Sequence, residues 1–295
     1  MKELFVLKRF SHNSIKKISI INEILEVYEA EGYRLTLRQL YYQLVSRGHI
    51  ENSVKSYKNI GMLVSDARLA GQIDWEMIED RGRIIKSPVC WNNPAEIVNA
   101  AAKQFTIDKW KDQENYTEVM VEKDALSGVL WPVCSRLNIS FMANKGYSSS
   151  SAMYEAGARL LRKIDEGKRI SIFYLGDHDP SGIDMTRDVE ERLSLFSRDS
   201  IGVVRLALNL DQVKALNPPE NPAKETDSRA KKYISEFGHS SWELDAIEPK
   251  QLDCLITDAV MGLMDRKKWK KAMQKEKEMR SELEEFVENY KEKNL

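Results

Sequence analysis

The sequence predicts an α/β protein with a mostly helical N-terminal module followed by a domain built on a parallel sheet. Two patterns support this fold class. Apolar residues first recur at the three- and four-residue spacing of helices, and beyond about residue 117 short apolar runs alternate with helical stretches. Strand–helix alternation is typical of a doubly wound parallel sheet. With 295 residues, the chain is long enough for two such units.

Residues 1–86 are predicted to form a winged-helix module. The first helix carries apolar residues at helical spacing, which are Ile15, Ile18, Ile21, Leu25 and Tyr28. A second helix begins at Thr36, because Thr36 and Gln39 have the spacing of a capping box. A third covers residues 53–70, and residues 75–85 could form a β-wing. Three short helices and a wing are typical of winged-helix modules, with an ordinary helical bundle as the alternative.

The rest of the chain is divided into a linker, the sheet domain and a tail. Residues 87–116 contain Pro88 and Pro94 and are interpreted as the linker. The sheet domain with a C-terminal extension covers 117–265, and 266–295 form a charged, exposed helical tail. The expected strands are 118–121, 139–143, 170–175 and 203–208, the expected helices are 149–166 and 180–196, and 209–228 is expected to be an irregular surface loop.

Composition narrows the class of protein without naming a partner. Hydrophobic residues make up 42% and charged residues 31%, which excludes a disordered chain. The net charge of −1 gives no overall argument for nucleic acid. Residues 1–70, however, hold 11 Lys or Arg and 7 Asp or Glu. That local excess of positive charge is compatible with DNA binding and equally with a solvated surface.

Location and cysteine chemistry follow from short apolar runs and an odd cysteine count. The apolar runs are too short to cross a bilayer, and the N-terminus lacks a signal-peptide core, so we expect no membrane partner and a cytoplasmic location. Cys90, Cys134 and Cys254 are widely spaced and form neither a disulfide framework nor a zinc pattern. They are therefore expected to be core thiols.

Acidic residues follow two of the expected strands. Glu122 comes directly after the first strand, and Asp177 and Asp179 come after the third. Because carboxyl ends of parallel strands share one edge, and residues two apart in extended chain point the same way, the three carboxylates should converge while His178 turns aside. Hard oxygen ligands favour Mg²⁺. Asp179 before Pro180 is also an ordinary helix N-cap, which explains Asp179 alone.

This arrangement of a glutamate after one strand and Asp-x-Asp after a later one resembles the Toprim domain of topoisomerases, bacterial primases and several nucleases. The similarity covers about residues 118–208. It implies that Glu122, Asp177 and Asp179 are the metal and acid–base carboxylates. Lys123 beside Glu122 is similar to the Glu-Lys pair common in topoisomerase VI A subunits, and we expect it to contact DNA.

The helix that begins at Thr36 carries two adjacent tyrosines. Tyr41 lies within the apolar stripe formed with Leu37, Leu40, Leu44 and Val45, so it should be a core residue. Tyr42 lies outside that stripe, near Arg38 one turn earlier, on a partly exposed face. A phenol and a guanidinium there could act as nucleophile and phosphate clamp. The alternative is an aromatic residue that only packs beside Arg38.

Arg38 and the Tyr41-Tyr42 pair are similar to the Arg-x-x-Tyr-Tyr motif of topoisomerase VI A subunits and the related meiotic break-forming protein. The chain most resembles the reduced A-subunit-like proteins of mobile elements. The resemblance implies that Tyr42 attacks double-stranded DNA and forms a 5′-phosphotyrosine link, with Mg²⁺ as cofactor. It also implies a homodimer in which tyrosine and metal come from different protomers, and a separate ATPase B-type subunit. The competing interpretations are a Toprim nuclease that uses water and a non-catalytic DNA-binding protein.

Several further polar residues have two interpretations. Lys224 and Arg229, with Lys231 and Lys232, could contact DNA phosphates or belong to a solvated loop. Glu243 and Asp245 could extend the acidic site but are interpreted as surface acidity. The serines at 148–151 are interpreted as the capped start of a helix.

Overall fold

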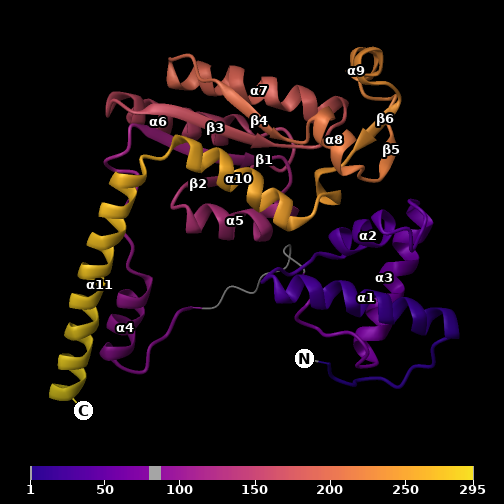
Figure 1. Ribbon diagram of the computed structural model, residues 1–295, viewed down its shortest axis with the longest axis horizontal. Coiled ribbons are helices and arrows are strands. Elements are labelled where there is room, and N and C mark those ends of the chain that lie inside the picture. Colours follow the sequence, from indigo (N-terminus) through magenta and orange to yellow (C-terminus); the bar gives the residue numbers. More distant parts are fainter. Residues whose placement is uncertain (1, 80–87, 295) are drawn as a thin grey trace.

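A computed structural model describes residues 2–79 and 88–294, with side chains described up to residue 290. The fold is a mixed α/β arrangement with a four-stranded parallel sheet, which confirms the predicted fold class (Figure 1). Its helical N-terminal module contacts the sheet domain near the carboxyl ends of the strands.

The N-terminal module is built from three helices, α1 (His12–Ala30), α2 (Leu37–Ser46) and α3 (Val54–Leu69). The predicted capping box is present, because Thr36 donates its backbone N–H to Gln39 Oε1 at 2.8 Å and Gln39 donates its own to Thr36 Oγ1 at 3.3 Å. Part of the predicted wing, residues 80–85, lies outside the described residues. Within 75–79, Ile78 makes an isolated parallel bridge to Leu35.

The sheet domain has strand order β2-β1-β3-β4, and every pairing is parallel. The strands are β1 (Asn115–Val121), β2 (Ser140–Ala143), β3 (Arg169–Leu175) and β4 (Val203–Ala207), each close to its predicted range. Helices α5 (Ser127–Arg136) and α10 (Pro249–Leu263) cover one face, while α6 (Ser150–Asp165) and α7 (Pro180–Ser197) cover the other. Alternate residues of β1 explain both layers: Val119 and Val121 pack toward α5, and Met120 packs toward α6.

Residues 209–228 are more ordered than an irregular loop, so that prediction is wrong. They contain helix α8 (Leu210–Leu216) and strand β5 (Glu220–Pro222). The backbone of Asn209 donates to Gln212 Oε1 at 2.9 Å, which caps the helix despite the polar sequence. Strand β5 pairs antiparallel with β6 (Ser240–Trp242), and a two-stranded ribbon leaves its proline at an edge, where proline is tolerated. Helix α9 (Ala230–Phe237) and the short 3₁₀ helices η1 (Asp124–Leu126) and η2 (Leu244–Ala246) complete this domain.

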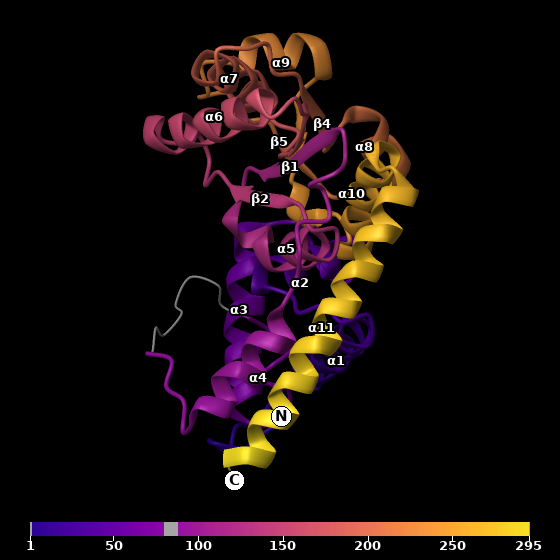
Figure 2. The same ribbon diagram turned by 90° about the vertical axis from the view of Figure 1, so that its left-hand side faces the viewer.

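Helix α4 (Pro94–Gln104), within the predicted linker, packs along the long helix α11 (Arg266–Asn294). The pair forms an arm that extends away from the sheet (Figures 1 and 2). Glu276 accepts a backbone N–H from Ile107 at 3.0 Å, and Arg280 donates to the Phe105 carbonyl at 2.7 Å. The tail is helical as predicted, but one side of it is held against α4.

Among the described residues, helices that combine the length and the apolarity needed to cross a membrane are absent. Cys134 is buried on the inner side of α5, as predicted for a core thiol. Cys90 and Cys254 are exposed, so that prediction is wrong for them. Cys254 belongs to α10 but lies outside the apolar stripe of Leu252, Ile256 and Val260 that faces the sheet.

Candidate functional site

Glu122 lies at the carboxyl end of β1, beneath the loop that follows β3. Its backbone N–H bonds the Leu175 carbonyl at 2.9 Å, and its buried carboxylate accepts the N–H of Asp177 at 2.8 Å. Two glycines leave room for it. A Cβ on Gly176 would lie 2.9 Å from Glu122 Oε2, and one on Gly182 would lie 2.3 Å from the Asp177 carbonyl. The loop therefore closes over Glu122 only because both positions lack a side chain.

Asp177 is the most strongly perturbed acid of this site. One oxygen accepts the N–H of Leu244 at 2.9 Å, and the other lies 2.6 Å from Lys123 Nζ. Burial raises the pKa of Asp177 to about 7, with Lys123 opposing the shift. Burial also raises the pKa of Glu122. Both carboxylates are thus held where a negative charge is poorly solvated, which is common for acids at functional sites.

Lys123 supplies positive charge inside the site. Its ammonium lies within 2.9 Å of Asp245 and 3.1 Å of Glu243, in addition to Asp177. These carboxylates raise the pKa of Lys123 against the effect of burial. The residue predicted to contact DNA is therefore an internal counterion in this structure.

Glu243 and Asp245 belong to the centre of the site, so their interpretation as surface acidity is wrong. The Asp245 side chain is fully buried, and Glu243 is mostly buried. An antiparallel bridge between His178 and Trp242 brings their segment beside the loop after β3. This tertiary contact, together with the bond from Leu244 N–H to Asp177, brings them beside Asp177. The sequence did contain a sign of this burial, because Glu243 and Asp245 alternate with the apolar residues Trp242, Leu244 and Ala246.

Asp179 has the role of a helix cap. Its Oδ1 accepts the N–H of Gly182 at 2.6 Å at the start of α7, whereas Asp177 points toward Lys123. His178 turns aside as predicted and meets the Tyr233 hydroxyl at 2.8 Å among aromatic rings. Burial lowers the pKa of His178 to about 4, so it is neutral at pH 7.

Arg205 is a residue of the site that sequence reasoning missed. From β4 it donates to the carbonyls of Gly182 at 2.9 Å and Gly176 at 3.0 Å, and also to the Asp177 carbonyl. It therefore fixes the loop that carries both aspartates. A single arginine within the apolar run 203–207 was the available signal.

The N-terminal module contacts this site through α2. Arg38 donates through Nε to Glu243 Oε2 at 3.1 Å and makes a second, shorter bond through Nη2 to the same oxygen. Glu243 thus contacts Arg38 and Lys123 together. Beside this contact, Tyr41 and Tyr42 pack against Ala246 of η2.

Tyr42 is buried at 4% exposure, so the prediction of a partly exposed face is wrong for it. The face outside the apolar stripe of α2 docks on the sheet domain instead of meeting water. Burial and the charge of Glu243 raise the pKa of Tyr42 to about 12, although Arg38, 5.8 Å from the ring centre, opposes the shift. Tyr41 is a buried residue as predicted, and its hydroxyl bonds Asn52 at 2.9 Å.

The remaining basic candidates lie outside this network. Arg229 pairs with Asp184 at 2.7 Å and Asp227 at 3.4 Å and lies over the Tyr147 ring. Lys224 is exposed on the same segment. Ser149 caps α6 through Ala152 N at 3.2 Å, which confirms the interpretation of that serine run as a helix start.

No protein-family model, curated protein or solved structure matches the chain. The evidence about function is therefore the site itself. In the part of the chain that the structure describes, no three His, Cys, Asp or Glu side chains are grouped closely enough to hold a metal ion as they stand. The donors still suit Mg²⁺ in kind, because they are carboxylate oxygens whose burial already favours a positive partner.

Proposed function

We propose that the protein cleaves double-stranded DNA by Mg²⁺-dependent transesterification, with Tyr42 as the nucleophile. One observation supports this most directly: Glu243 is bonded to Arg38 of the tyrosine helix and to Lys123 of the carboxylate cluster. A phenol, a guanidinium and buried acids thus occupy one connected network. Residues 1–86 would be a winged-helix module and 117–265 a Toprim domain.

The reaction needs a base for the attacking phenol and a proton for the leaving oxygen. The Tyr42 oxygen attacks a DNA phosphorus and loses its proton to Glu243, whose carboxylate faces the phenol. The bond from phosphorus to the 3′ oxygen of the neighbouring deoxyribose breaks. That oxygen takes a proton from solvent. The products are a 5′-phosphotyrosine and a free 3′-hydroxyl, and reversal reseals the strand.

Electrostatic support comes from both modules. Arg38 would hold the attacked phosphate, because its guanidinium is about half exposed beside Tyr42. Mg²⁺ held by Glu122, Asp177 and Asp179 would stabilise charge on the phosphoryl oxygens. Lys224 and Arg229 would contact the DNA backbone, whereas Lys123, which was expected to do so, would balance the charge of the carboxylates. The active form would be a homodimer that works with a separate ATPase B-type subunit.

Trapping of a protein–DNA adduct on a denaturing gel tests this proposal. Wild-type protein with supercoiled plasmid and Mg²⁺ should give a covalent adduct, and Tyr42→Phe or EDTA should abolish it. Tyr41→Phe is the matched control, since its hydroxyl bonds Asn52 and the Ser53 backbone and has a structural role. It should retain the adduct.

A hydrolytic Mg²⁺-dependent nuclease is the second candidate, and the burial of Tyr42 with a pKa raised to about 12 favours it. In that case water attacks the phosphorus and Tyr42 only packs. Undiminished plasmid cleavage by Tyr42→Phe, without any adduct in the wild type, would select this function over transesterification.

A further inference from the structure

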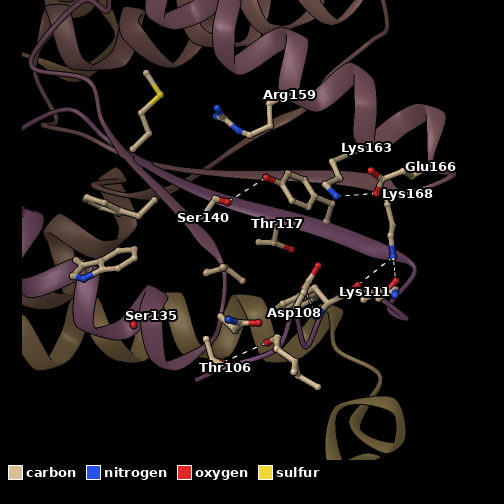
Figure 3. Close-up of a pocket in the computed structure, with 18 of the residues that line it drawn as sticks. Thr106, Asp108, Lys111, Thr117, Ser135, Ser140, Arg159, Lys163, Glu166 and Lys168 are labelled. Carbon is tan, nitrogen blue, oxygen red and sulfur yellow. Dashed lines mark hydrogen bonds and ion pairs between the residues drawn. The ribbon is translucent and has the colours of Figure 1, made fainter. Parts of the chain in front are cut away.

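A hollow of about 1300 Å³ opens beside β2, away from the carboxylate site (Figure 3). Residues of β1, β2, α5, α6 and α11 and of the segment 104–111 line it. Pockets for small molecules usually measure about 300–1,000 Å³. This hollow therefore has room for a segment of polypeptide.

Strand β2 lines the hollow through Ser140, Phe141 and Met142 and has one unpaired edge. It pairs with β1 on one side, and no further described strand follows it on the other. Asn144 donates its N–H to the Val121 carbonyl at 2.8 Å, so the alternating residues Ala143 and Phe141 direct their N–H and C=O groups toward the open edge. Charged side chains and prolines usually protect an edge strand from pairing with another chain. The four residues of β2 include neither.

The opposite edge of the sheet differs in this respect. On β4, the N–H of Val203 is bonded to Glu190 Oε2 at 3.0 Å. The register between β3 and β4 also shifts at Tyr174 and Leu175, which disturbs the ladder. One edge of the sheet is therefore closed by its own side chains, whereas β2 is left accessible.

The hollow has two walls of different chemistry. Toward α5, Phe141 lies with Trp131, which is 53% exposed, and with Phe105 from the arm. Toward α6, Arg159 and Lys163 line the opposite side (Figure 3). Five Lys or Arg and two Asp or Glu line the hollow, and Arg159 and Arg280 are paired with Glu118 and Glu276 beside it, so a small excess of positive charge favours an acidic occupant.

We propose that the hollow binds an extended segment of a protein partner, in which apolar and acidic side chains alternate, as an added strand on β2. The backbone of that segment would pair with Phe141 and Ala143. Because side chains of a strand alternate between faces, apolar residues would meet Trp131 and Phe141 while acidic ones meet Lys163 and Arg159. Both cations already have a carboxylate partner. Arg159 is bonded to the buried Glu118, whereas Lys163 is bonded to the exposed Glu166, so an acidic side chain of the segment would compete with Glu166 for Lys163.

A fluorescein-labelled hexapeptide, Glu-Val-Glu-Ile-Glu-Val, tests the proposal by fluorescence anisotropy with the full chain. Saturable binding is expected, and a peptide with Lys in place of Glu, or with a central proline, should bind at least about tenfold more weakly. Ala143→Pro removes one outward N–H while leaving the ladder to β1, and Lys163→Glu inverts the charge of one wall. Each should weaken binding by at least about tenfold.

Two controls keep the result interpretable. Lys214→Glu makes the same charge change on exposed α8 and should bind like the wild type. Trp131→Ala changes an exposed side chain and should weaken binding even if Ala143→Pro fails to fold. Absence of saturable binding, equal binding of the Lys peptide, or unchanged affinity in both Lys163→Glu and Trp131→Ala would overturn the proposal. So would a dimer that Ala143→Pro dissociates, because β2 would then bind a second copy.

Discussion

Two buried glutamates, Glu118 within β1 and Glu122 directly after it, have very different surroundings. Glu118 receives two bonds from Arg159, at 2.6 and 2.9 Å, and a third from the Tyr116 hydroxyl at 2.7 Å. Glu122 receives one backbone N–H from Asp177. Its cationic neighbours, Lys123 and Arg205, are bonded to other groups.

This difference in hydrogen bonding indicates that Glu118 has a structural role, whereas Glu122 is available for chemistry. Glu118 has a dedicated cation and satisfied oxygens, so it has little capacity to bind anything else. Glu122 and Asp177 share positive charge with other acids, and burial raises the pKa of each. Buried acids with raised pKa values are typical of functional sites. Substitutions of four residues, Arg159, Glu122, Asp177 and Asp179, test this comparison.

Replacement of Arg159 should have the largest effect. Arg159→Met leaves Glu118 as a buried charge without its cation, which should lower the free energy of unfolding by about 3–5 kcal/mol. Urea denaturation measures this value. Arg162→Met, an exposed arginine on the same helix, should change it by less than about 0.5 kcal/mol. Similar stability of the two variants would show that Glu118 is not held by this pair.

Glu122→Gln should affect activity far more than stability. Glutamine keeps an oxygen for the Asp177 N–H and removes a buried charge, so unfolding should change by less than about 1 kcal/mol. DNA cleavage should fall at least about 100-fold, as for loss of other groups that stabilise charge in a transition state. Plasmid cleavage measures this. The reverse pattern, lost stability with cleavage intact, would make Glu122 a structural residue like Glu118.

Asp177 should make stability depend on pH. Its pKa is raised to about 7, above about 3.9 for the unfolded chain, so the folded form binds the proton more tightly. The contribution is complete below about pH 4 and is lost as pH rises through about 7. Asp177→Asn should therefore gain stability relative to the wild type between about pH 4 and 7. Parallel urea titrations across that range measure the difference, and a constant difference would contradict the raised pKa.

Asp179 should make a modest contribution to stability. Asp179→Ala removes the N-cap of α7 and should cost about 1 kcal/mol, whereas Asp179→Asn keeps a capping oxygen and should cost much less. If Asp179 also holds Mg²⁺, both variants lose cleavage. Retained cleavage in Asp179→Asn would leave capping as its role.

Local sequence patterns were sufficient for most elements of the fold. The four strands, the helix starts at Thr36 and Asp179, and Glu122 at the end of β1 all follow from periodicity and capping rules over a few residues. Local patterns failed at 209–228, where a helix cap and a two-stranded antiparallel sheet stabilise a polar segment. They also failed for the face of α2, since helix periodicity identifies one apolar stripe and does not show what covers the other side.

The sequence by itself determined the parallel sheet, its strand order of appearance and the acids at its carboxyl edge, because these depend on residues close together in the chain. Only the tertiary structure decided that Glu243 and Asp245 lie at that edge, that Lys123 forms ion pairs with both, and that Tyr42 is buried against Ala246. These contacts link segments up to about 200 residues apart, as with Arg38 and Glu243. No local pattern encodes such a meeting, since it arises when two separately folded surfaces exclude water between them.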